Sequence, residues 1–205
     1  MPEATARRLL VFDVMGTIVF EPFAEVVPRS LGMSFADLIA QKDPHAWFAF
    51  ERGEIDEAEL RRCFFADGRD YDHEGMKAAM AAAYTYLDGM EALLEELSAA
   101  GHELHLMSNY PCWYQLIEDK LRLSRFARWT FVSCHAGVRK PDPAAYRWLA
   151  ARLDCAPDDM VFVDDREDNC TAARALGIDA IRYDNTLRLR RDLVARGWLT
   201  PGAPR

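Results

Sequence analysis

The stretch RRLLVFDVMGT, residues 7–17, contains a short apolar run that ends on Asp13. Its central part, LLVFD (9–13), has the length and composition of a buried β-strand. Four similar runs follow along the chain, at ELHLMS (103–108), WTFVS (129–133), MVFVDD (160–165) and DAIRY (179–183). Segments with helical periodicity separate most of these runs. This alternation predicts an α/β fold, a parallel sheet with helices on both faces.

Residues 21–86 interrupt the alternation, and we name them the cap segment. Four helix-like pieces occur here, each with its own start signal. They are SFADLIAQ (34–41), which begins at Ser34, PHAWFAFERG (44–53), preceded by Asp43, DEAELRRCFF (56–65), with a capping-box pattern of Asp56 and Glu59, and DHEGMKAAMAAAYTYL (72–87). The pattern predicts a small all-helical insertion between two parts of a core, residues 1–20 and 87–205.

Composition excludes several classes of function. Half of the 205 residues are apolar, 28% are charged, and the net charge is −8. A surface with this balance repels polyanions, so we expect no nucleic-acid partner. No apolar run approaches the ~18 residues that a membrane span needs. Five scattered cysteines without a C-x-x-C pair favour reduced thiols and a cytoplasmic location.

Polar and charged residues follow four of the expected strands directly or within a few positions. In a parallel sheet with helical crossovers, the C-terminal ends of the strands meet in one crevice. The residues expected there are Asp13, Ser108 with Asn109, Lys140, and Asp164 with Asp165. A lone Asp after a strand, or Ser-Asn in a turn, is ordinary loop chemistry. The shared position of the whole set at strand ends is what indicates a functional site.

These side chains suit phosphoryl transfer, in which catalysis consists mostly of placement and charge neutralisation. Asp13 is expected to attack phosphorus and form an aspartyl-phosphate. Three close carboxylates would repel one another unless a hard divalent cation lay among them. We therefore expect a Mg²⁺ site formed by Asp13, Asp165 and the backbone carbonyl of Met15, with Asp164 holding a metal-bound water.

Other residues of the crevice are expected to bind the phosphoryl group itself. Lys140 would neutralise the charge on its oxygens, and Ser108 would donate a hydrogen bond to one of them. Gly16 and Thr17 would let the backbone turn away beneath the phosphate, which places Thr17 among the substrate-binding candidates. Arg139, which precedes Lys140 in the same loop, is a further candidate for a phosphate contact.

Four motifs occur in a fixed order along the chain, at DVMGT (13–17), LMSN (106–109), Lys140 in RKPDP, and VDD (163–165). This ordered set resembles the haloacid dehalogenase (HAD) superfamily. The resemblance covers nearly the whole chain and implies a Rossmannoid core with a four-helix cap that closes over the active site. It also implies a hydrolase in which Asp13, Ser108, Asn109 and Lys140 form the catalytic set.

Three longer stretches resemble the plant chloroplast flavin mononucleotide (FMN) hydrolases. They are FERGEIDEAELRRCFFADGRDYDHEG (50–75), YLDGMEALLEEL (86–97) and NYPCWYQLIEDKLRLS (109–124) followed by WTFVSCHAGVRKPDP (129–143). This resemblance implies a small phosphorylated metabolite as substrate, either a phosphorylated flavin or a related phosphomonoester. Trp47 would then stack on the isoalloxazine ring. The protein would be a monomer or homodimer, located in the plastid stroma if a transit peptide had been removed.

Met15 departs from the phosphatase pattern of the superfamily, in which a second Asp two residues after the nucleophile acts as general acid and base. A thioether is only a weak acceptor and has no proton to give. Three hypotheses remain open. The chain is a slow or specialised Mg²⁺-dependent phosphatase, a metal-independent 2-haloacid dehalogenase, or a catalytically impaired binding protein. The paired Asp164 and Asp165 favour the first, because without a cation they would crowd a carboxylate nucleophile.

Overall fold

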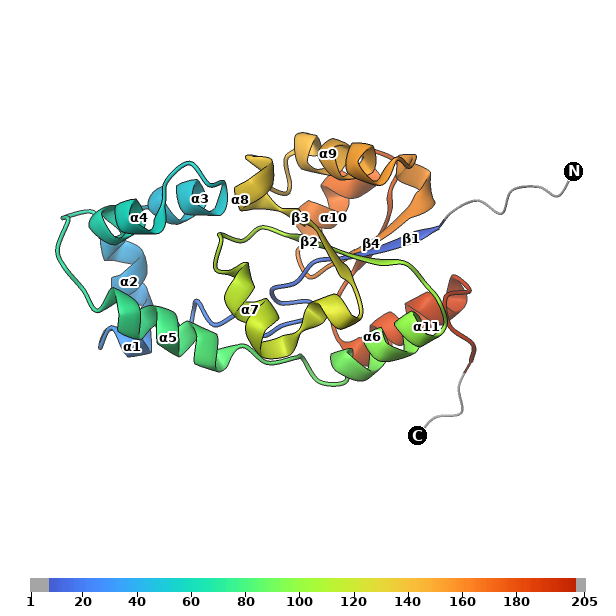
Figure 1. Ribbon diagram of the computed structural model, residues 1–205, viewed down its shortest axis with the longest axis horizontal. Coiled ribbons are helices and arrows are strands. Elements are labelled where there is room, and N and C mark those ends of the chain that lie inside the picture. The colour runs from blue at the N-terminus through green and yellow to red at the C-terminus, as the bar shows by residue number, and fades with distance from the viewer. Residues whose placement is uncertain (1–7, 202–205) are drawn as a thin grey trace, which may run out of the picture.

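The computed structural model describes residues 8–201, and a five-stranded parallel sheet forms its centre (Figure 1). The strand order is β3-β2-β1-β4-β5. The strands are β1 (Leu9–Phe12), β2 (Leu104–Ser108), β3 (Arg128–Val132), β4 (Met160–Asp164) and β5 (Asp179–Arg182). All five predicted strands are confirmed, with ends shifted by one residue at most. β1 lies between β2 and β4. From β1 the chain first adds strands on one side of the sheet, β2 and β3, and then on the other side, β4 and β5. α/β proteins bind ligands at such a switch in strand order.

Alternating side chains of β1 pack into two separate cores, one on each face of the sheet. Leu10 and Phe12 belong to the larger core, whereas Leu9 and Val11 belong to the smaller one. Since all four are fully buried, β1 has no solvent-facing side and reads as a continuous apolar run. This double burial fixes the strand rigidly, and with it the residue that follows, Asp13.

Helices cover both faces of the sheet, as predicted (Figure 1). The larger core includes side chains of α6 (Met90–Ala99), α7 (Tyr114–Leu121) and α11 (Thr186–Ala195). The smaller core is covered by α9 (Pro143–Leu153) and α10 (Glu167–Arg174). Short helical turns also occur at η1 (Leu123–Arg125), α8 (Ser133–Ala136) and η2 (Pro157–Asp159). Asp142 is the N-cap of α9, and its carboxylate accepts from the Ala144 N–H.

The cap segment forms a lobe at one end of the sheet (Figure 1). The four predicted helices are α2 (Phe35–Gln41), α3 (Ala46–Glu51), α4 (Glu57–Cys63) and α5 (His73–Ala83). The predicted capping box of α4 is present, since Asp56 accepts from the Glu59 N–H and Glu59 accepts from the Asp56 N–H. An additional short helix that was not predicted, α1 (Val26–Ser30), packs on α5.

Two connecting segments join the cap segment to the sheet and pair with each other. The Phe20 N–H donates to the Thr85 carbonyl at 2.9 Å, and the Leu87 N–H donates to the Ile18 carbonyl at 2.9 Å. Val19 also forms an antiparallel bridge with Tyr86. The chain therefore leaves and re-enters the sheet region at one place, close to the end of β1.

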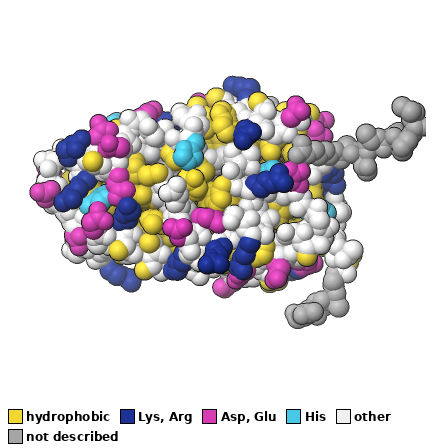
Figure 2. All heavy atoms as spheres, viewed as in Figure 1, with side chains coloured by type: hydrophobic (Ala, Val, Ile, Leu, Met, Phe, Trp, Pro, Cys, Tyr) yellow, Lys and Arg dark blue, Asp and Glu magenta, His cyan; other side chains and the backbone are white. Residues whose placement is uncertain are grey.

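Charged side chains of both signs are mixed over the molecular face shown in Figure 2. This mixture agrees with the acidic net charge and offers no continuous basic area on that face for a polyanion. Among residues 8–201, no helix has the length and apolarity needed to cross a membrane.

Candidate active site

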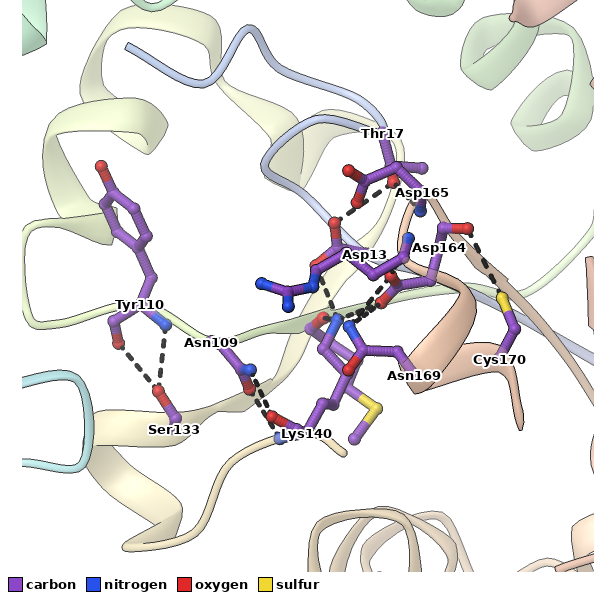
Figure 3. A network of polar contacts seen from close by, with 12 residues as sticks. Asp13, Thr17, Asn109, Tyr110, Ser133, Lys140, Asp164, Asp165, Asn169 and Cys170 are labelled. Atoms are coloured by element: carbon purple, nitrogen blue, oxygen red, sulfur yellow. Dashed lines mark hydrogen bonds and ion pairs between the residues drawn. The ribbon is translucent and has the colours of Figure 1, made fainter. Parts of the chain in front are cut away.

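The site lies where β1, β2 and β4 end. Asp13 directly follows β1, Ser108 is the last residue of β2, and Asp164 is the last residue of β4. These strands are neighbours with aligned registers, because Phe12 pairs with both Leu106 and Val163. All three side chains are buried. The predicted convergence at strand ends is therefore present in the structure (Figure 3).

Lys140 connects the strand ends through a buried ammonium group. Its Nζ donates to Asp13 Oδ1 at 2.6 Å, to Asp164 Oδ2 at 2.7 Å and to the Met107 carbonyl at 2.8 Å. Three acceptors use all three protons of the ammonium group. In Figure 3 the chain of Lys140 reaches between the two aspartates. Such a group is placed to neutralise charge that develops beside Asp13.

The carboxylate of Asp13 is held from a second side by Thr17. The Thr17 hydroxyl donates to Asp13 Oδ2 at 3.2 Å and accepts from the Asp165 N–H at 3.1 Å. The Thr17 hydroxyl is thus engaged by the protein itself and orients Asp13. Burial raises the pKa of Asp13 to about 8, opposed by the charge of Lys140 and reinforced by the charges of Asp164 and Asp165.

Asp164 is enclosed by donors on both carboxylate oxygens. Besides Lys140, the Arg166 N–H donates to Oδ1 at 2.9 Å, and the Asn169 amide lies 3.0 Å from each oxygen. This set holds Asp164 in one orientation and gives both of its carboxylate oxygens hydrogen-bond donors in a site closed to water. Asn169 was not predicted as a site residue, although it ends the stretch VFVDDREDN, residues 161–169. Its spacing of five residues from Asp164 carries it into the first turn of α10.

Asp165 completes a group of three carboxylates that could hold a metal ion. One oxygen from each of Asp13, Asp164 and Asp165 lies within 4.8 Å of the other two. Gly16 has φ +77°, and a Cβ at this position would come within 2.8 Å of Asp165 Oδ2. The glycine is therefore required both by the backbone turn and by the close approach of Asp165.

Asn109 and Ser108, side by side at the end of β2, have different surroundings. The Asn109 amide donates to the Lys140 carbonyl and accepts from the Lys140 N–H, both at 2.8 Å. Asn109 therefore fixes the loop that carries Lys140. The buried Ser108 hydroxyl has no hydrogen-bond partner among the described residues. A buried hydroxyl left in this state is costly, and a ligand that accepts from it would remove the cost.

Glu51 on α3 accepts hydrogen bonds from both Trp47 and Arg139. The Trp47 indole donates to Glu51 Oε1 at 2.8 Å, and Arg139 Nε donates to Oε2 at 2.9 Å. The Arg139 guanidinium also lies 4.5 Å over the ring of Phe48, whose side chain is 40% exposed. Burial raises the pKa of Glu51 against the charge of Arg139.

Ser133, which the sequence analysis assigned only to a strand end, ties this cluster to the sheet. Its hydroxyl donates to the Glu51 carbonyl at 2.5 Å and accepts from the Tyr110 N–H at 3.0 Å. No local sequence signal marks this contact, because Ser133 and Glu51 are 82 positions apart. The cap segment and the loop before Lys140 are therefore held together at the site.

A family model and several known proteins are similar to this chain. A family model described as a haloacid dehalogenase-like hydrolase matches residues 8–177. The chain is 48% identical over 185 residues to flavin mononucleotide hydrolase 1, chloroplastic, from Arabidopsis thaliana, covering 90% of this chain and 76% of that protein. It is 27% identical to a sesquiterpene phosphatase from Aspergillus oryzae, covering 89% of this chain and 93% of that protein.

The fold is likewise similar to solved structures. A HAD family enzyme from Bacteroides thetaiotaomicron, in complex with magnesium and inorganic phosphate, superimposes with a TM-score of 0.73 at 18% identity. The match covers 87% of this chain and 95% of that chain. At this identity the likeness concerns the fold, and it confirms the architecture expected from the four motifs.

Proposed function

The chain belongs to the haloacid dehalogenase-like hydrolase family, and on this premise we propose that it is a Mg²⁺-dependent phosphatase acting on a phosphomonoester through Asp13. The observation that carries the proposal is the contact of the Lys140 ammonium with Asp13 and Asp164 in a buried site. A carboxylate held against a cation at the end of a strand is suited to attack phosphorus, because the same cation then neutralises the transferred group.

The donor set fits a hard divalent cation. Asp13, Asp164 and Asp165 bring three negative charges and Lys140 brings one positive charge, which leaves two negative charges to neutralise. Mg²⁺ prefers such carboxylate oxygens, together with carbonyls and water. We propose Asp13, Asp165 and the carbonyl of Met15 as ligands, with Asp164 as the outer support. When bound, the ion would hold substrate phosphate and favour the ionised form of Asp13.

The residues of the chain then have separate tasks. Thr17 and Lys140 orient the Asp13 carboxylate for attack on phosphorus, which breaks the ester bond and forms an aspartyl-phosphate. Ser108 donates its unpartnered hydroxyl to a phosphoryl oxygen. Asn109 keeps Lys140 in place through two main-chain hydrogen bonds. Water then hydrolyses the aspartyl-phosphate and returns Asp13.

We propose a phosphorylated flavin as the substrate class, supported by the 48% identity to the Arabidopsis protein named as an FMN hydrolase. Phe48 and Trp47 on α3 provide aromatic surface beside Arg139, the arrangement that a planar ring with polar edges requires. Because Trp47 also packs edge-on against Trp113, the more exposed Phe48 is the better stacking partner. Because that relative is named as a chloroplast protein, we propose a plastid as the compartment of this chain.

Phosphate release from purified protein tests this function. FMN, phosphoglycolate and a sugar phosphate would be compared with Mg²⁺ and with EDTA. We expect Mg²⁺-dependent release, fastest from FMN, and its loss in Asp13→Asn. The exposed Asp119→Asn on α7 is the matched control and should retain activity. No release from any phosphomonoester would overturn the proposal, and chloride release from 2-chloropropionate in EDTA would replace it with a dehalogenase.

A further inference from the structure

The site as described has no proton donor for the leaving group. An alcohol leaves phosphorus poorly as an alkoxide, so phosphatases protonate its oxygen. Met15 stands two residues after Asp13 and has no proton to give. Asp164 is bound by Lys140, Asn169 and a main-chain N–H on its two oxygens. The proton must therefore come from a group that these contacts do not already use.

Glu51 is also committed to other partners. Its two oxygens accept from the Trp47 indole and from Arg139 Nε, so a proton on Glu51 would break an ion pair. That ion pair is mostly buried, and neutralising one partner of such a pair is costly. Glu51 thus holds the cap segment against the loop of Lys140 and is poorly suited to cycle a proton.

Glu21 lies at the end of the loop that begins with Met15. Within this loop Val19 forms a parallel bridge with Met15, and the Gly16 N–H donates to the Val19 carbonyl at 2.8 Å. Val19 therefore lies next to Met15, and Glu21 follows Val19 by two residues. The Phe20 N–H then bonds to the Thr85 carbonyl, which fixes the backbone immediately before Glu21.

We infer that Glu21, at the end of this fixed loop, donates the proton to the leaving oxygen and later accepts one from the attacking water. The inference rests on the proposed phosphatase function. Glu21 keeps an exposed side chain, and its Oε1 accepts a single local hydrogen bond from the Phe23 N–H at 3.0 Å. This leaves Glu21 the freedom to protonate that Glu51 and Asp164 lack.

The electrostatic surroundings of Glu21 support this role. Although the side chain is open to water, the many protein atoms around it partly desolvate its charge, and Glu51 and Asp165 repel it, against the hydrogen bond from Phe23. Together these effects raise the pKa of Glu21 to about 7. The backbone just before Glu21 lies between the sheet and the chain returning from the cap segment, because Val19 bridges both Met15 and Tyr86. A general acid is most effective when its pKa lies near the working pH.

The two steps balance in atoms and charge. In the first, an Asp13 oxygen forms a bond to phosphorus, the ester P–O bond breaks, and the Glu21 carboxyl proton moves to the released alcohol oxygen. In the second, water forms a bond to phosphorus and gives its proton to the Glu21 carboxylate. The bond between phosphorus and Asp13 breaks, which releases inorganic phosphate and restores both side chains.

Comparing two substrates tests the inference, because a leaving group that needs no proton does not require the acid. We would measure Glu21→Gln with FMN and with p-nitrophenyl phosphate, following the pre-steady-state burst of nitrophenolate. Glutamine keeps the acceptor for the Phe23 N–H. We expect alcohol release from FMN to fall by ~10²-fold or more, whereas the nitrophenolate burst keeps its rate. Glu25→Gln, an exposed neighbour without a side-chain capping bond, should leave both reactions unchanged.

Three outcomes separate the inference from the function on which it rests. No turnover by the unsubstituted protein overturns the proposed function. Turnover of FMN by Glu21→Gln at the rate of the unsubstituted protein overturns the inference alone, as does an equal slowing of the FMN reaction and the nitrophenolate burst. Recovery of FMN turnover when Met15→Asp is added to Glu21→Gln supports it, because the Asp restores a carboxyl where the family usually has one.

Discussion

Lys140 is the residue on which the charge balance of the site depends. It is fully buried and pairs with two buried carboxylates, Asp13 and Asp164. Replacing it by methionine would keep most of the volume but leave both carboxylates without their cation. Removing one partner of a buried pair costs about 3–5 kcal/mol of unfolding free energy. We therefore expect Lys140→Met to be inactive and to lose stability of this order in urea unfolding at pH 9 without Mg²⁺, where Asp13 is ionised.

Lys42→Met is the matched control for Lys140→Met. The Lys42 ammonium has one long contact, at 3.5 Å, to the Asp43 carbonyl, and it is only partly buried. Surface substitutions of this kind usually change unfolding free energy by less than ~0.5 kcal/mol. Equal losses in the two variants would show that Lys140 has no special electrostatic role.

Residues at strand ends could be predicted from the sequence, and residues that depend on tertiary contacts could not. Asp13, Ser108 and Asp164 were placed correctly because a buried strand fixes the position of the residue at its end. Glu21 lacks such a marker, because the charges that act on it, Glu51 and Asp165, come from the cap segment and from the residue after β4. Ser133 was recognised only as part of a strand, since its bond to Glu51 joins segments far apart in sequence.

At the scale of elements, Glu57 on α4 links the cap segment to Trp113, the residue before α7. Burial acts against its charge, but hydrogen bonds from Lys77, Trp113 and His73 outweigh burial and lower the pKa of Glu57 to about 2. A lowered pKa in the folded state contributes stability above the unfolded value of about 4.5, and this contribution is lost as pH falls toward 2.

Glu57→Gln should therefore lower the free energy of unfolding at pH 7. Because the group is partly exposed and screened, we expect about 1–2 kcal/mol. The difference in free energy of unfolding between Glu57→Gln and the unsubstituted protein should shrink below about pH 4.5, because protonation of Glu57 gives the two proteins the same charge at this position. Urea unfolding at pH 7 and at acid pH measures this difference. The exposed Glu95→Gln on α6 is the control, and a pH-independent loss in Glu57→Gln would contradict the charge-based explanation.

Within the cap segment, the helices with a clear capping residue were predicted well, and α1, which has none, was missed. Ser34 accepts from the Asp37 N–H, and Asp43 accepts from two N–H groups at the start of α3. In contrast, α1 has no side-chain capping bond, spans only five residues and contains Pro28. Its stability comes from packing on α5, which local propensity cannot indicate.

At the scale of the whole molecule, the titration of the site changes the stability of the fold. The pKa of Asp13 rises from 3.8 in the unfolded chain to about 8 in the metal-free protein, mainly through burial. Between these values the folded protein binds more protons than the unfolded chain, so this group makes stability fall as pH rises. A bound cation must displace the proton from Asp13, so the proposed Mg²⁺ site couples metal affinity to pH.

Mg²⁺ should therefore stabilise the protein more at pH 8 than at pH 6. At a Mg²⁺ concentration of one hundred times its dissociation constant at pH 8, the expected gain in unfolding free energy is about 2.7 kcal/mol. The same concentration should give a smaller gain at pH 6, where Asp13 is mostly protonated. Urea unfolding with Mg²⁺ and with EDTA measures both gains, and Asp165→Asn should abolish them while Asp119→Asn keeps them. If Asp165→Asn retained the full gain, the stabilising ion would be bound away from this carboxylate group and the assignment of the site would be wrong.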